Sequence, residues 1–456
     1  MVQIEPGTLD IDTIEKTVKT FINSKELNNL VSNDEYFLGR DTHIMHRAVP
    51  DDSGPDNRIP VSYARRIINI VVGYMYKPGL ISYASDNQPY LDAISAVLEE
   101  NREPIRTEQI GKQCSIHGVG YEYHWVDAED ATPRFCKLPA TEVIPIYDFS
   151  VDPELWAFIR FYKKDDHIEI FVYDNATITE YWMDDKKGKI IFVGRLPHYY
   201  GEVPLVVFLN NEERLGDFDP IEPLIDVYDT LMSDSMNEFD RFAWAYLVLK
   251  GMSLTKENAA EIKRKRMFDG LDDEQAVSFL TKTIDSAFIK LMFDTIRAEI
   301  HRQSGIPNLD DYTFGGSASG ETLDKFIYLM ELFTDPKESY FREGLYQRIK
   351  LITTILNLRD GVTGEPREID IVMNRNKPDS TLEHADAFNK YAGHLSERTL
   401  IENFAPFVTD VDEELKRLEE EKAVYDQGFN DESTGERKGD NGDIEAGGKK
   451  AQAGVS

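Results

Sequence analysis

The 456-residue chain is strongly acidic, with 51 lysines and arginines against 83 aspartates and glutamates and a formal net charge of −32 at pH 7. This charge disfavours proteins that wrap DNA loosely or bind anionic membranes. Hydrophobic residues make up 41% of the chain, which is ordinary for a globular protein, so most of the chain should fold. The length predicts about two to four domains.

Cysteine content and the N-terminal sequence indicate the compartment. The two cysteines, Cys114 and Cys136, are too few for a disulfide scaffold and fit a reducing environment. The first residues, MVQIEPGTLDID, lack the basic and then apolar pattern of a signal peptide. The most apolar run, Ile67–Tyr76, has about half the length that a membrane-spanning helix needs. We therefore expect a soluble protein that is made inside the cell and has no membrane partner.

Helical periodicity dominates the first part of the chain. Apolar residues recur at helical spacing between Ile11 and about Leu38, which predicts one or two amphipathic helices. After a turn-rich segment, Arg40–Arg58, three further helices are predicted. They cover about Ser62–Tyr76, Tyr90–Asn101 and Thr107–His117.

From Val119 the hydrophobic period changes to two. Tyr121, Tyr123 and Trp125 alternate with polar residues, as on a strand with one buried face. Further alternating runs separated by turn residues predict an antiparallel β region. Its other strands cover about Arg134–Leu138, Val143–Tyr147, Ala157–Lys163, His167–Tyr173, Thr177–Met183, Lys189–Val193 and Pro204–Leu209.

Two long helices are predicted at about 221–246 and 284–303. The segment 247–283 between them reads as two short strands around a basic helix, which carries Lys263, Arg264, Lys265 and Arg266. From Asp217 to Asp240 there are eight carboxylates and no basic residue. By default this is a solvated helix face. Because the charges repel one another, they are tolerated more readily if the face has a purpose, such as the lining of a wet channel.

A glycine- and serine-rich break, residues 304–321, follows the second long helix. Gly315 and Gly316 allow backbone angles that other residues avoid. The break also contains two acids and two aromatic residues, namely Asp310, Asp311, Tyr312 and Phe314.

A longer helix is predicted at 322–358, and we expect a kink at Pro336, because proline lacks the N–H group that a helix interior needs. A strand at about 368–373 and helices within 377–425 follow. From Asp426 the composition predicts a disordered acidic and glycine-rich tail, residues 426–456.

The sequence contains no recognisable catalytic or cofactor motif. The phosphate-binding loop of ATPases and the glycine pattern of dinucleotide sites are both absent. His43 and His46 lie three residues apart, but no other His or Cys cluster completes a metal site. We therefore expect no catalytic residues, no metal, no cofactor and no enzymatic activity. The basic run Lys263–Arg266 is compatible with a solvated helix face or with a contact to DNA phosphates or an acidic partner.

Five stretches in the same order resemble the portal proteins of tailed bacteriophages, specifically those of long-tailed phages of Gram-positive hosts. They begin with NRIPVSYARRIINIVVGYMYKPGLISY (57–83) and GVGYEYHWVDAEDATPRFCKLPATEVIPIYD (118–148). The long stretch 210–251 follows, then SGIPNLDDYTFGGSASGETLDKF (304–326) and LSERTLIENFAPFVTDVDEELKRLEEE (395–421). Together these stretches spread over most of the chain before the tail.

The resemblance implies an α+β subunit with an α/β wing, a two-helix stem, a small α/β clip, a long kinked helix and a helical crown. Carried over to this chain, the wing is 1–216 with the strand 366–376 returning to it, and the stem helices are 217–246 and 284–303. The remaining parts are the clip at 247–283, the tunnel loop at 304–321, the long kinked helix at 322–358 and the crown at 377–425.

The same resemblance implies a homo-oligomeric ring, normally a dodecamer, at one capsid vertex of the virion, assembled in the host cytoplasm. Double-stranded DNA would pass through its channel during packaging and ejection. Implied partners are the terminase large subunit, a head-completion or adaptor protein, and the major capsid and scaffold proteins. Within this frame, we expect Asp310, Asp311, Tyr312, Phe314, Gly315 and Gly316 to form the DNA-facing tunnel loop. We expect Lys263–Arg266 to contact DNA or the motor.

Two other functions remain open at this point. A different capsid-associated assembly or scaffold protein would share the acidity and the helical arms but would lack a channel. A metal-dependent DNA-processing enzyme would use clustered acids, although no discriminating metal motif occurs in the sequence.

Overall fold

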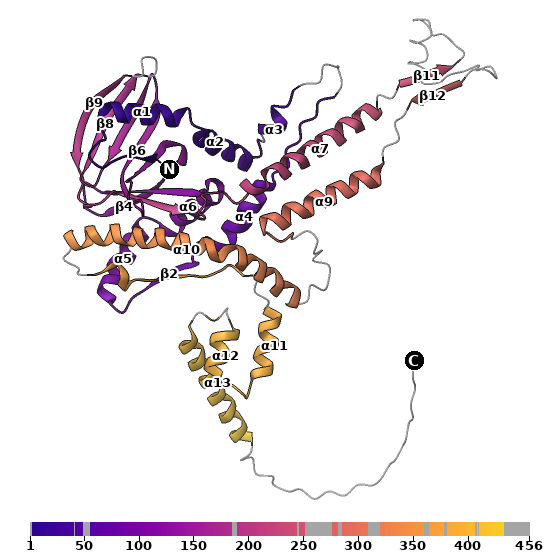
Figure 1. The fold of residues 1–456 in the computed structure, drawn as a ribbon. Coiled ribbons are helices and arrows are strands. Elements are labelled where there is room, and N and C mark those ends of the chain that lie inside the picture. The colour runs from indigo at the N-terminus through magenta and orange to yellow at the C-terminus, as the bar shows by residue number, and fades with distance from the viewer. Residues whose placement is uncertain are drawn as a thin grey trace, which may run out of the picture. The chain divides into compact units, whose positions relative to one another are not determined.

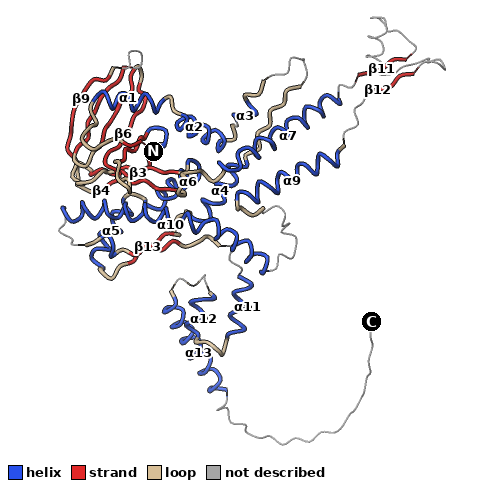
Figure 2. The backbone as a smooth tube through the Cα atoms, in the orientation of Figure 1, coloured by secondary structure: helices blue, strands red, loops and turns tan. Residues whose placement is uncertain are grey.

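The computed structural model (Figures 1 and 2) describes residues 2–40, 42–48, 55–184, 189–243, 246–250, 276–280, 285–308, 320–359, 364–377, 381–405, 408 and 410–432. The chain divides into two compact units, Met1–Lys377 and Pro378–Ser456. Helices and strands are mixed throughout the first unit, and helices make up the described part of the second. The predicted α+β fold class is therefore confirmed.

Two capped helices open the chain. α1 (Ile11–Ile22) and α2 (Lys25–Leu38) replace the single run of helical periodicity seen in the sequence. Asp10 and Ser24 each precede one helix and accept a hydrogen bond from a backbone N–H of its first turn. The break falls at Asn23 because Ser24 caps the next helix there, which satisfies donors that the helix leaves free.

A six-stranded sheet carries the β region that the sequence predicts. Its strands are β1 (Val2–Gln3), β5 (Val143–Tyr147), β6 (Leu155–Lys164), β7 (His167–Tyr173), β8 (Thr177–Asp184) and β9 (Ile190–Pro197), paired in that order. The predicted antiparallel pairing is confirmed from β5 to β9, whereas β1 joins β5 in parallel. Figure 1 shows α1 lying over this sheet, and Ile14, Val18 and Phe21 bury their side chains against it.

A second, three-stranded sheet lies in the larger hydrophobic core. Its strands pair in the order β10 (Leu205–Leu209), β3 (Val119–Val126) and β4 (Pro133–Leu138). The helices that share its core include α4 (Tyr63–Met75), α5 (Gln88–Glu100), α6 (Glu103–His117) and α10 (Gly320–Arg359). A Cβ atom at Gly344 of α10 would come within 2.3 Å of the Phe208 ring, so only glycine permits this approach of helix to strand.

One helix boundary and one strand in this region differ from the prediction. α6 begins at Glu103 rather than at about Thr107, because Pro104 occupies the first turn, where its missing N–H costs nothing. The short strand β2 (Ile81–Ala84) was not predicted, and it pairs antiparallel with β13 (Asp370–Met373). The strand has only four residues, of which two have exposed side chains, so its periodic signal is too weak to detect.

An antiparallel pair of helices extends from the core (Figures 1 and 2). α7 (Glu222–Ala243) and α9 (Ser286–Ser304) occupy the two positions where long helices were predicted. The rings of Tyr228 and Phe293 meet edge-on between them, with centroids 5.2 Å apart. In sequence between these helices, β11 (Tyr246–Lys250) and β12 (Ala276–Leu280) form an antiparallel pair. None of the described helices combines the length and hydropathy required to span a membrane.

The second unit contains α11 (Thr381–Tyr391), α12 (Glu397–Phe404) and α13 (Val411–Glu432). Ser396 caps α12, and the rings of Tyr391 and Phe404 stack with centroids 5.6 Å apart. α13 continues beyond Asp426, where we predicted that disorder begins. Extending an existing helix costs less than starting one, so composition alone placed this boundary too early.

Buried charges connect α10 to the three-stranded sheet and to α6. The Arg348 guanidinium is fully buried and donates to both carboxylate oxygens of Glu122, at 2.8 and 2.7 Å. It also donates to Glu103 at 3.1 Å and to the Thr107 hydroxyl at 2.7 Å. The rings of Phe135 and Phe208 lie 4.9 and 5.3 Å from the guanidinium carbon and shield it.

One prediction about β3, the exposure of its polar side chains, is wrong. The sequence pattern treats Glu122 and His124 as the polar, exposed side of the strand, yet both are completely buried. Burial by itself would raise the pKa of Glu122, but Arg348 and His124 lower it to about 2. Burial also lowers the pKa of His124, so its neutral ring donates from Nε2 to the ionised Glu122 carboxylate at 3.0 Å.

We expect Glu122→Gln to lower the free energy of unfolding at pH 7 by about 3 kcal/mol, because Arg348 then lacks its buried counter-charge. The folded-state pKa of Glu122 lies below its ordinary value of 4.5. Its stabilisation is therefore complete above that value and is lost as the pH falls toward about 2. Urea unfolding should show that the difference in free energy of unfolding between wild type and variant is smaller at pH 3.5 than at pH 7.

The matched control for this experiment is Glu142→Gln, whose carboxylate is 28% exposed and lies 3.4 Å from Arg160. This change should cost less than about 1 kcal/mol. Equal losses for both variants, or a difference that does not depend on pH, would contradict the role assigned to Glu122.

Candidate functional site: the acidic face of α7

The residues that the sequence singles out lie mostly outside the described part of the chain. This holds for Asp310, Asp311, Tyr312, Phe314, Gly315 and Gly316 and for Lys263, Arg264, Lys265 and Arg266. Their roles stay predictions. Pro336 lies inside the continuous helix α10, whose axis changes direction along its course in Figure 1. The kink at Pro336 itself also stays a prediction.

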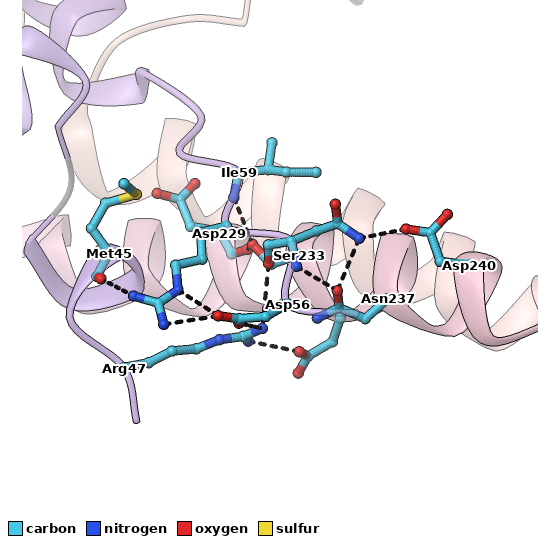
Figure 3. Close-up of polar contacts among 11 residues, drawn as sticks. Met45, Arg47, Asp56, Ile59, Asp229, Ser233, Asn237 and Asp240 are labelled. Carbon is cyan, nitrogen blue, oxygen red and sulfur yellow. Dashed lines mark hydrogen bonds and ion pairs between the residues drawn. The ribbon is translucent and has the colours of Figure 1, made fainter. Parts of the chain in front are cut away.

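The acidic face of α7 is described, and a segment from the N-terminal region lies along it. We call residues 45–48 and 55–61 the cover segment. Figure 3 shows Asp229, Ser233 and Asn237 directed from α7 toward this segment. The cover segment reaches α7 from more than 160 positions earlier in the sequence, as the separation of 168 between Val61 and Asp229 illustrates.

Three backbone N–H groups of the cover segment form a ladder with α7. Val61 donates to the Asp229 carboxylate at 2.8 Å and Ile59 to the Ser233 hydroxyl at 3.0 Å. Asn57 donates to the Asn237 side-chain oxygen at 2.6 Å. Two residues of extended chain span about 6.6 Å, and one step of four residues along a helix spans about 6.0 Å. The two repeats match, so an extended strand can bind every fourth residue of the helix.

The end of the ladder is closed by the Asn57 side chain. Its amide donates to the Asp240 carboxylate at 2.7 Å and to the Asn237 side-chain oxygen at 3.0 Å. Asn237 and Ser233 are buried, so their polar atoms depend on these partners. The sequence did carry a signal for this contact, because Asp229, Ser233 and Asn237 repeat at an interval of four on a helix.

The cover segment also supplies cations to the acidic face. Arg47 pairs with Asp234 of α7 at 2.8 Å and with Asp56 at 3.2 Å. Arg58 pairs with Asp56 at 2.8 Å and donates to the Met45 carbonyl. Hydrogen bonds from Arg58, and then from Arg47, lower the pKa of Asp56 despite the opposing effect of desolvation. The two arginines and Asp56 thus form one network against α7 (Figure 3).

The other aspartates of this region are bound as well. Asp226 accepts a hydrogen bond from the Tyr36 hydroxyl at 2.6 Å. Asp219 accepts from the Asn33 side chain at 2.9 Å and from a backbone N–H, and burial raises its pKa. Asp217 is buried and pairs with Lys337 of α10 through both oxygens, at 2.6 and 2.7 Å.

The lining of a wet channel stays a prediction, but the chain itself supplies partners to the aspartates, which reduces the repulsion that the sequence suggested. All six aspartates between 217 and 240 contact groups of the chain itself. They are Asp217, Asp219, Asp226, Asp229, Asp234 and Asp240. The sequence suggested free repulsion because the balancing groups come from distant segments. The arrangement holds a helix in place, and it contains no pairing of nucleophile and base.

α9 presents a different surface. Ala287, Leu291, Thr295 and Ala298 recur at helical spacing and are all exposed. The neighbouring Phe288 is 58% exposed, and Phe239 near the end of α7 is 66% exposed. A surface with several exposed apolar side chains suits packing against another protein surface, although Lys290 and Asp294 add charges to it.

Within the described ranges, no group of three His, Cys, Asp or Glu side chains has the arrangement of a metal site. His43 lies 3.9 Å from Asp226, and this pair lacks the further ligands that a metal ion would need.

Comparison with known proteins connects this architecture to one family. Residues 18–428 match the family model described as phage portal protein, SPP1 Gp6-like. The portal protein of Clostridium phage phiCD119 is 25% identical over 394 residues, which cover 81% of this chain and 86% of the relative. The portal protein of Bacillus phage SPP1 is 25% identical over 401 residues, which cover 82% of this chain and 78% of the relative.

Solved structures give weaker similarity. The neck of an empty GTA particle computed with C6 symmetry has a TM-score of 0.48 at 12% identity, covering 75% of this chain and 89% of that chain. The neck of the native GTA particle computed with C12 symmetry has a TM-score of 0.43 at 11% identity, with the same two coverages of 75% and 89%.

We expect Asn237→Ala to loosen the cover segment, because it removes the acceptor of two hydrogen bonds from Asn57. Leaving buried donors unsatisfied costs about 1–3 kcal/mol, so transient opening should increase about tenfold or more. Limited trypsin digestion should then cut faster after Arg47 and Arg58. Ser235→Ala, on the same helix but outside the ladder, is the matched control and should digest like wild type. Unchanged cleavage in Asn237→Ala would contradict the ladder.

Proposed function

This chain belongs to the SPP1 Gp6-like family of phage portal proteins, and we propose that its copies form a ring-shaped channel through which double-stranded DNA is packaged and ejected. As a family member it is a component of the phage virion with a portal function at the capsid vertex. The observation that carries the proposal is the family match, which extends over residues 18–428 and therefore includes both units.

The proposed parts of the subunit follow the order of its elements. We assign α7 and α9 to the stem, with residues 247–283 between them as the clip and residues 304–321 as the tunnel loop. The antiparallel packing of α7 on α9 supports a stem made of two helices. We further assign 1–216 with the returning strand 366–376 to the wing, and 377–425 to the crown. β13 pairs with β2, which supports the return of that strand to the N-terminal region.

The proposed oligomer is a dodecamer. Its partners are the DNA, the terminase large subunit during packaging, a head-completion or adaptor protein afterwards, and the major capsid and scaffold proteins during assembly in the host cytoplasm. The family is a structural one, which favours this proposal over a metal-dependent DNA-processing enzyme. The family match likewise favours a portal over a scaffold protein that lacks a channel.

In the proposed channel, DNA would approach the tunnel loop. Asp310, Asp311, Tyr312 and Phe314 would face the duplex, and Gly315 and Gly316 would let the loop change shape as DNA advances. The net charge of −32 would repel phosphates and limit sticking within about 10 Å of the surface at moderate ionic strength.

Electron microscopy of the purified full chain should show a ring with an axial hole, and class averages should give its symmetry. The family match is the reason for this expectation. Homogeneous particles without an axial hole would contradict the channel. A ring with a symmetry other than twelvefold would contradict only the dodecamer.

Replacing Lys263, Arg264, Lys265 and Arg266 with alanine or glutamate should reduce DNA packaging while leaving rings intact, because the proposed contact with DNA or the motor depends on positive charge. Packaged DNA per particle would be measured by nuclease protection. Lys186 and Lys187, which follow β8 in the sequence, provide a control in which two lysines are changed to alanine. Normal packaging by the clip variants would contradict the contact.

A further inference from the structure

A short segment after β13, residues 374–377, connects distant parts of the first unit. We call it the strap. The backbone N–H of Asn376 donates to the Tyr74 carbonyl at 3.0 Å, and its side chain donates to the Gly73 carbonyl at 3.1 Å. These carbonyls belong to the last turn of α4, where a helix has no acceptor partners of its own. Asn374 donates to the Leu80 carbonyl at 2.8 Å. The strap is therefore anchored firmly beside α4.

From this anchor, Arg375 reaches along one face of α10. Its side chain is 6% exposed and contacts three carboxylates, namely Glu331 at 3.2 Å, Asp335 at 3.3 Å and Glu338 at 2.5 Å. Positions 331, 335 and 338 are spaced by four and three residues, so they lie on one side of the helix. Without a cation between them, these three charges would repel one another.

Pro336 lies in the middle of this contact. Proline has no N–H, so the carbonyl of Leu332 loses its helical donor and the ring crowds the preceding turn. Glu331 and Asp335 precede the proline and Glu338 follows it. Arg375 thus bridges α10 at the point where one of its own hydrogen bonds is missing.

The two halves of α10 differ in how tightly they are held. After Pro336, Lys337 pairs with the buried Asp217, and Arg348 is fixed in its charge cluster. Phe341, Leu345 and other side chains of this half are fully buried. Before Pro336, Tyr328, Leu329 and Leu332 are 63%, 49% and 56% exposed. The first half therefore has less packing to fix its direction.

Glu331, in the first half of α10, makes two further polar contacts. It accepts a hydrogen bond from the Tyr74 hydroxyl at 2.9 Å and pairs with Lys377 at 2.9 Å. Burial acts to raise its pKa, but Lys377 and Tyr74 outweigh this effect and lower it. The carboxylate is thus charged and available to Arg375 at neutral pH.

We propose that Arg375 is a positioning residue, which fixes the direction of the first half of α10 across Pro336 by bridging carboxylates on both sides of it. Apart from this bridge, the first half is held by few buried side chains, among them Met330 and Thr334, and by the contacts of Glu331 with Tyr74 and Lys377. Because the second unit begins at residue 378, a force on the chain there acts first on the strap and through it on α10. The bridge lies within a single subunit and does not depend on the proposed ring.

Hydrogen–deuterium exchange on the full chain tests the proposal. In Arg375→Gln, amide exchange in residues 325–335 should increase about tenfold or more, because charged hydrogen bonds are lost. Residues 341–356 should keep the exchange of wild type. Arg375→Lys, which keeps one charge but loses the forked geometry, should restore part of the protection. No change in 325–335, or an equal rise in both halves, would overturn the proposal.

Two further variants separate positioning from general stability. Arg342→Gln is the matched control, because Arg342 contacts Glu338 and the Ile371 carbonyl, both outside the first half of α10. It should leave exchange in 325–335 unchanged. In Pro336→Ala, the new N–H can bond to the Leu332 carbonyl. Adding Arg375→Gln to this variant should therefore raise amide exchange in 325–335 much less than it does when Pro336 is present. An equal effect in both backgrounds would show that Arg375 does not act across the proline.

If Arg375→Gln does not fold, Asp335→Asn provides a milder test. Asp335 is 68% exposed and loses only its pairing with Arg375. It should raise exchange in 325–335 by a smaller factor and leave 341–356 unchanged. Exchange like that of wild type in both regions would again overturn the proposal.

Discussion

The ion pair between Arg348 and Glu122 is the contact on which the first unit depends. A buried guanidinium is tolerated only where carboxylates and aromatic rings surround it, and here α6, β3, β4 and β10 all contribute. Shifting α10 by a single residue would leave at least two charges buried without partners. The ion pair therefore sets the register of the long helix against the sheet, which apolar packing alone would specify less sharply.

In the acidic region around α7, charged side chains likewise have partners from distant segments. Its aspartates are bound by the cover segment, by α2 and by Lys337, so a charge count that suggests a free acidic surface describes internal connections instead. The ladder works because two residues of extended chain and four residues of helix have nearly the same length. The helix that we assign to the stem is in this way tied to the body of the subunit over several turns.

α10 combines both kinds of contact. Its second half is fixed by buried ions and a close approach to β10, whereas its first half has fewer buried side chains and contacts Arg375 through Glu331 and Asp335. A long helix that is rigid at one end and held by a few polar contacts at the other can change direction without unfolding. In the proposed channel, such a subunit would allow local movement of one helix while the rest of the subunit stays in place.

Most of the secondary structure and the family could be predicted from local sequence patterns. Alternation located the strands from β3 to β10, helical spacing located α1, α2, α4, α7 and α9, and the ordered motifs identified the portal family that the match over residues 18–428 confirms. Which polar residues are buried could not be predicted in this way, because their burial depends on contacts between distant segments. Glu122 looks like the exposed side of a strand, and Asp229 looks like a solvated helix face, because periodicity depends only on neighbours in sequence. Their partners, Arg348 and Val61, lie 226 and 168 positions away, and no local pattern carries the information that two such distant segments meet.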